Sequence, residues 1–155
     1  MSSQTYPKTV ELYGSSNQHE AIASTAITPG MLVARTGVNA DGADTVGVHS
    51  VSGGVANPSF AVEYDLDGRG IDDDYAEGDN VVFRTYTNGS AVYAVLGEGE
   101  EVEAGDFLMS GGDGTLVAHT AGGFVVAQAL EAPHPNGRVR AEILTGFVPG
   151  VGGGD

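Results

Sequence analysis

The chain has 155 residues, enough for one domain with its own core, and it has no cysteine, which excludes disulfide bonds, thiolate metal sites and cysteine nucleophiles. Its formal charge of −15, from 21 acidic and 6 basic residues, is a poor match for nucleic-acid phosphates or for anionic membranes. No apolar run approaches the ~20 residues of a membrane span and no signal-peptide pattern is present, so we expect synthesis in the cytoplasm.

Two interpretations of the acidity compete: a disordered acidic segment, and a folded domain adapted to high salt. The composition is 41% hydrophobic and the charges are interspersed with valine-rich stretches, which favours a folded domain. At ~1 M salt the Debye length is about 3 Å, so repulsion between carboxylates is screened. Lys8 is the only lysine. We therefore predict a halophilic source.

The first 19 residues are predicted to form an extended N-terminal arm. Serine and glutamine dominate its start, Pro7 interrupts it, and residues 8–13 suit one extended piece. Residues 17–24, at the boundary of the arm, are compatible with a helical turn or with a strand, and the pattern does not decide between them.

Short apolar stretches separated by turns follow, which is typical of an all-β domain. The 25 glycines are spread along the chain, and many stand beside Asp or Asn, as in tight turns that need a positive φ. The strands that we expect cover residues 31–36, 45–51, 59–64, 80–87, 91–96, 107–110, 115–119, 123–131 and 138–144.

Two connections carry hairpin signals. The dipeptide Asn88-Gly89 predicts that the strands on either side of it pair with each other. The glycine-rich turn at residues 111–114 predicts a second hairpin. In the last strand, period-2 alternation puts Arg138, Arg140 and Glu142 on one face and apolar side chains on the other. That face suits pairing with acidic neighbours across a subunit boundary, or salt bridges within the chain.

The acidic stretch over residues 65–79 is the best candidate for a cation site, because closely spaced carboxylates supply the oxygens that calcium binds. The candidate ligands are Asp65, Asp67, Asp72, Asp73 and Asp74. The stretch does not match an EF-hand, since Arg69 and Ala76 stand where ligands are needed. A solvated acidic loop is the simpler interpretation, so we assign no metal.

The sequence carries no motif of an enzyme, neither a nucleophile elbow nor a phosphate-binding or dinucleotide-binding loop. The four histidines are isolated, and no pair has the spacing of a zinc site. Lys8 lies in the arm, which excludes a lipoyl or biotinyl carrier hairpin. A triad that meets only in space leaves no motif and stays open. We predict no catalytic residues, no cofactor and no enzymatic activity.

Three groups of residues form an ordered set. They are residues 68–79 (GRGIDDDYAEGD), then 102–108 (VEAGDFL) with 110–116 (SGGDGTL), then 126–132 (VAQALEA) with 138–140 (RVR). In this order and spacing they resemble the capsid decoration, or cement, proteins of tailed viruses. The resemblance is best over residues 60–145 and looser in the N-terminal third.

The resemblance implies a homotrimer on the outside of the assembled capsid, where it bridges and stabilises subunits of the major capsid protein without catalysis. The acidity suggests a virus of a halophilic archaeon. The N-terminal arm is a candidate for reaching a neighbour by strand addition. The candidate contact residues are Lys8, Val10, Leu12, Arg138 and Arg140.

The sequence thus predicts an all-β protein with an extended arm at residues 1–19, a domain with hairpins at residues 20–149, and a flexible glycine-rich tail at residues 150–155. The resemblance implies that the domain is small and β-barrel-like. The alternative function is a β-domain on a virion or cell surface that binds a glycan or protein receptor. Such a domain would need exposed aromatic rings, and the chain has six tyrosines and no tryptophan.

Overall fold

The computed structural model describes residues 6–64, 66 and 68–148, and over these residues it contains strands and no α-helix. The strands are β1 (Glu11–Tyr13), β2 (Ser16–Ala23), β3 (Val33–Val38), β4 (Asp44–Val48), β5 (Ser59–Ala61), β6 (Asn80–Tyr86), β7 (Ala91–Val95), β8 (Phe107–Ser110), β9 (Leu116–Ala118), β10 (Phe124–Ala129) and β11 (Arg138–Phe147). The predicted all-β class is confirmed, and residues 17–23 lie in a strand.

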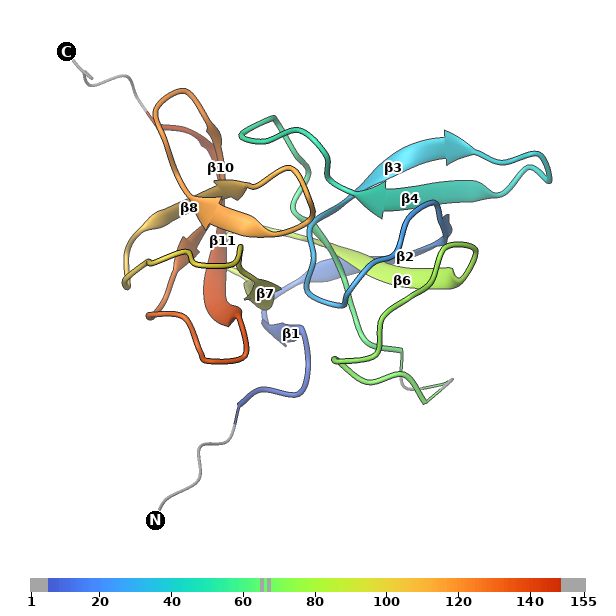
Figure 1. Ribbon diagram of the computed structural model, residues 1–155, viewed down its shortest axis with the longest axis horizontal. Coiled ribbons are helices and arrows are strands. Elements are labelled where there is room, and N and C mark those ends of the chain that lie inside the picture. The colour runs from blue at the N-terminus through green and yellow to red at the C-terminus, as the bar shows by residue number, and fades with distance from the viewer. Residues whose placement is uncertain (1–5, 65, 67, 149–155) are drawn as a thin grey trace.

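The strands form two sheets. Sheet A has the order β1-β7-β11-β10-β8-β9, and sheet B has the order β3-β4-β2-β6-β5. Figure 1 shows sheet A on the left and sheet B on the right. An isolated bridge between Leu32 and Phe60 brings β5 close to the segment that enters β3, so sheet B curls. In place of the expected barrel, the described residues form two sheets without a closed barrel.

The core has two parts, because β6, an interior strand of sheet B, is buried on both faces. Successive side chains of a strand point to opposite faces. In β6, Val82 and Tyr86 join the large cluster that also contains side chains of sheet A, such as Val92 and Ile143. Val81 and Phe83, on the other face, join a smaller cluster inside the curl of sheet B.

Two bent segments connect the sheets. The chain passes from sheet A to sheet B between β1 and β2, and from sheet B to sheet A between β6 and β7. The two segments run antiparallel, with β1 beside β7 and β2 beside β6. At the bend, Ser15 N donates to Ser90 Oγ (3.0 Å) and Thr87 N donates to Ser15 O (3.1 Å).

The predicted hairpin across Asn88-Gly89 is wrong. The turn itself forms, with Ser90 N donating to Thr87 O (3.1 Å), but β6 and β7 belong to different sheets. The physical reason is competition between partners. The whole of β6 pairs with β2, and β7 pairs with both β1 and β11, so long-range pairing outweighs the local turn signal.

The second predicted hairpin is confirmed, since β8 pairs antiparallel with β9. Asp113 Oδ1 accepts bonds from the Thr115 backbone N (3.1 Å) and from the Thr115 hydroxyl (2.5 Å) in the connecting turn. The hydroxyl bond is the main cause of a lowered pKa of the Asp113 carboxyl. A charged carboxylate therefore holds this turn.

Much of the predicted N-terminal arm is built into the sheets. Residues 11–13 and 16–19 lie in β1 and β2. Val10 is fully buried in the large core cluster, and its O accepts a bond from Tyr93 N (2.7 Å). Leu12 is partly buried against the same cluster. Tyr6 also packs against this cluster, whereas Tyr13 is 53% exposed. Residues 1–5 and the predicted tail at 150–155 fall outside the described residues.

Candidate functional site

A cavity with both polar and apolar walls lies where β11 begins, between the N-terminal segment and the loop after residue 69. We call it the Arg138 pocket. It has a volume of about 530 Å³. Its walls include Tyr6, Lys8, Ile71, Tyr93, Asn136 and Arg138. Two of the basic residues singled out from the sequence, Lys8 and Arg138, therefore meet at one cavity although they are far apart along the chain.

Arg138 is the buried cation of this cavity, with an exposed fraction of 4%. Its Nη1 donates to Pro29 O (2.7 Å) and its Nη2 donates to Ile71 O (2.9 Å). The carboxylate of Asp72 lies 3.9 Å from Nη2, and that side chain is 89% exposed. Burial lowers the pKa of Arg138, while the negative charge of Asp72 opposes this effect.

A hydrogen-bonded chain of side chains supports the wall of the pocket. The Tyr93 hydroxyl bonds to His134 Nδ1 and accepts a bond from Asn136 Nδ2 (3.1 Å). His134 Nε2 lies 2.8 Å from Glu131 Oε2. Glu131 also accepts bonds from Arg140 Nε (2.9 Å) and Nη2 (3.1 Å). Arg140 thus has a partner within its own chain. The network also holds Tyr93, a residue of the pocket wall, in position.

The predicted cation loop is only partly described. Asp65 and Asp67 lie outside the described residues, and Asp72, Asp73 and Asp74 are exposed. Asp73 Oδ2 accepts a bond from Gly70 N (2.7 Å), which shapes the turn. In the part of the chain that the structure covers, no group of three or more His, Asp or Glu side chains is placed to hold a metal ion. A cation site in this loop stays a prediction.

A serine and a histidine do meet in space, but inside the protein. His49 Nδ1 lies 2.6 Å from Ser110 Oγ, and His49 Nε2 lies 3.0 Å from Val55 O. Ser110 has no exposed surface and His49 is 6% exposed. The pair connects β8 to the segment after β4, and its burial keeps substrates away from the hydroxyl.

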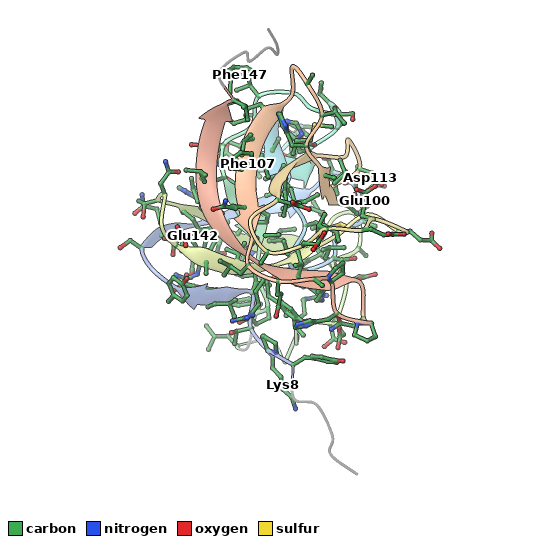
Figure 2. The ribbon with its side chains drawn as sticks, turned by 90° about the vertical axis from the view of Figure 1, so that its left-hand side faces the viewer. Lys8, Glu100, Phe107, Asp113, Glu142 and Phe147 are labelled. Atoms are coloured by element: carbon green, nitrogen blue, oxygen red, sulfur yellow. The ribbon has the colours of Figure 1, made fainter. Side chains whose placement is uncertain are left out.

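An apolar surface at the end of β11 was not predicted from the sequence. We call it the Phe147 surface. Phe147, Leu144 and Val148 are 61%, 39% and 36% exposed. Together with Phe107 and Val125 they line a shallow depression whose lining residues all lack charge. Figure 2 shows Phe147 and Lys8 at opposite ends of the molecule. The sequence signal was the return of apolar residues after the charged part of β11.

No protein-family model matches the sequence, and no curated protein matches it. The fold is similar to a solved structure described as the head fiber gp8.5 N base in bacteriophage phi29, with a TM-score of 0.61 and 18% sequence identity. The match covers 87% of this chain and 99% of that chain. At this identity the similarity concerns the fold. Within the described residues, no helix is long and apolar enough to cross a membrane.

Proposed function

We propose that this chain is a structural protein of a tailed-virus head that binds the outer surface of the assembled capsid. The observation that carries the proposal is the similarity of its fold to the head fiber base of bacteriophage phi29, over 87% of the chain. The ordered resemblance to capsid decoration proteins, read from the sequence alone, supports the same class of protein.

The proposed partner is the major capsid protein, and the proposed role is to bridge its subunits. A protein that binds only the assembled shell stabilises that state by mass action. If three copies act together, weak contacts add through avidity. No enzymatic step is needed for this role, and the Ser110–His49 pair is buried.

The proposed assembly is a homotrimer that forms through the Phe147 surface. Each chain carries a formal charge of −15, so charged faces of two copies repel each other. The Phe147 surface is lined by uncharged residues, and apolar surface of this kind is favourable to bury. A second copy of the same chain is therefore the occupant that we assign to it.

The alternative role, binding of a glycan or protein receptor, has less support from the structure. A glycan site commonly presents aromatic rings to the solvent. Tyr75, Tyr86 and Tyr93 are buried, whereas Tyr13 is 53% exposed. Among the described residues, the well-exposed aromatic side chains are Tyr13 on β1 and Phe147 at the end of β11, and they do not lie on one strand.

Sedimentation with shells tests the proposed function. Shells of the virus that encodes the chain, assembled without it, are mixed with the purified protein in molar salt and pelleted. We expect the protein to pellet with the shells and to saturate at a fixed ratio to the major capsid protein. Unassembled major capsid protein is the control and should not retain it. Protein that stays in the supernatant at all concentrations would contradict the proposal.

A further inference from the structure

We infer that the Arg138 pocket binds the carboxylate of an acidic side chain on a partner protein. The site follows from the local chemistry of this chain. The inference rests on the proposed function only for the identity of the partner, which would then be the capsid shell.

Arg138 is a buried cation whose N–H donors are only partly paired. A guanidinium has five N–H donors, and carbonyl oxygens of Pro29 and Ile71 occupy two of those of Arg138. Asp72 approaches to 3.9 Å and accepts no hydrogen bond from it. Buried charges are as a rule paired and hydrogen-bonded. Arg138 therefore keeps donors for one further acceptor, and that acceptor is best negatively charged.

The six basic residues of the chain differ in whether a carboxylate lies close to them. Four of them have a carboxylate oxygen within 3.5 Å, and these are Arg35, Arg69, Arg84 and Arg140. Among the described residues, Lys8 and Arg138 have no carboxylate that close. These are the two cations that line the pocket. In a chain with 21 acidic residues, both cations without a close carboxylate partner face the same cavity.

The lining of the Arg138 pocket suits an acidic side chain better than a free anion. Of the two cations in the lining, Arg138 is buried and Lys8 is exposed. The rings of Tyr6 and Tyr93 and the side chain of Ile71 supply apolar wall between them. An aspartate or glutamate side chain has the same arrangement, with a carboxylate at the end of a short apolar stem. A bidentate contact with a guanidinium is the strong form of this interaction.

The test uses the full chain in molar potassium chloride and a blocked peptide with a single acidic residue, Ac-Gly-Gly-Glu-Gly-Gly-NH2. Nitrogen-15 NMR follows the Arg138 Nε–Hε signal and the backbone amides of Gly70 and Ile71 during titration. We expect saturable shifts in these signals. The same peptide with Gln in place of Glu should give none. Free acetate should bind more weakly, because it lacks the stem and the flanking chain.

Two exposed positions provide variants that leave the buried arginine in place. Lys8→Gln removes the outer cation and should weaken peptide binding by about threefold or more, as for loss of a partly exposed ion pair. Asp72→Asn removes the competing internal carboxylate and should strengthen it. Arg35→Gln, with the same charge change far from the pocket, is the matched control and should have no effect.

The absence of saturable shifts, equal shifts with the Gln peptide, or acetate binding as tight as the Glu peptide would overturn the inference. So would equal affinities for wild type, Lys8→Gln and Asp72→Asn. Failure of the protein to pellet with shells, with peptide binding intact, would contradict the proposed function and leave the carboxylate site standing.

Discussion

At the scale of single residues, Glu131 ties β11 to the loop that precedes it. It accepts hydrogen bonds from two nitrogens of Arg140 and lies beside His134. Burial alone would raise the pKa of Glu131, but the hydrogen bonds from Arg140 and His134 outweigh it and lower that pKa below the usual 4.5. The charged form of Glu131 is therefore favoured in the folded state.

The stability of the protein should depend on this carboxylate in a defined pH range. Since the pKa of Glu131 is lower in the folded chain than in the unfolded chain, its contribution is present above pH 4.5 and is lost as the pH falls below that value. We expect Glu131→Gln to lower the melting temperature at pH 7 and to have a smaller effect at pH 3. Calorimetry at both values measures the difference.

The control for this prediction is Glu142→Gln, an equal change of charge on β11. Its effect on the melting temperature should be smaller than that of Glu131→Gln at pH 7. A Glu131→Gln effect that is the same at both pH values would show that the carboxylate charge does not matter.

For single residues, the strand pattern predicted the face on which a side chain lies but not how deeply the side chain is buried. Alternation correctly separated Arg138 and Arg140 from the buried Val139, Ala141 and Ile143. It could not show that Arg138 is buried and bonded to carbonyls of Pro29 and Ile71. Those partners come from two distant loops, and a strand pattern contains no information about them.

At the scale of elements, the bend between β1 and β2 depends on one glycine. Gly14 has a φ of 109°, in a region that side chains rarely adopt, and a Cβ there would lie 2.2 Å from Ser90 Oγ and 2.6 Å from Ser90 Cα. The close approach lets the two bent segments cross between the sheets.

Gly14→Ala should therefore destabilise the protein strongly. We expect a loss of more than about 2 kcal/mol in the free energy of unfolding, from backbone strain together with the clash against Ser90. Gly42→Ala is the matched control. Gly42 also has a positive φ (82°), but a Cβ there meets nothing within 4 Å, so about 1 kcal/mol is expected. Denaturant unfolding compares the two, and equal losses would contradict the role of the crossing.

Prediction of elements succeeded where the partner is local and failed where it is distant. The hairpin of β8 and β9 was predicted because four turn residues and both strands lie together in sequence. The Asn88-Gly89 signal misled, since β2 and β11 compete for the flanking strands from far along the chain. For the same reason the predicted arm was too long. Its last residues pair with β7 in sheet A and with β6 in sheet B.

At the scale of the whole molecule, the charge of −15 leads us to expect that the stability of the chain depends on salt. In dilute buffer the carboxylates repel one another over about 30 Å at 0.01 M salt, and in molar salt over only about 3 Å. We expect the melting temperature to rise steadily from dilute buffer to molar potassium chloride. A melting temperature that does not change with salt would contradict adaptation to high salt.

The trimer proposal is tested on the same scale by molar mass. In molar salt, light scattering after size exclusion should give three times the chain mass of 15.7 kDa. Phe147→Ser should shift the protein towards the monomer. Val38→Ser, at an apolar side chain that is 65% exposed on β3, is the control and should leave the trimer intact. A monomeric wild-type protein would refute assembly through the Phe147 surface.

The two surfaces lie at opposite ends of the molecule (Figure 2), so self-association at one end leaves the other free. This separation is compatible with the proposed trimer and with the proposed binding to a shell. The sequence contained the residues of both ends, but only the fold brought Lys8 to Arg138 and left Phe147 exposed.

Electron cryo-microscopy of shells incubated with the protein is the strongest test of binding to the outer surface of the capsid. Shells assembled without the chain are imaged before and after its addition in molar salt. We expect new density on the outer surface, at three-fold or quasi-three-fold positions, into which the two-sheet fold can be placed. Shells that remain bare, at concentrations where circular dichroism shows the protein to be folded, would contradict it.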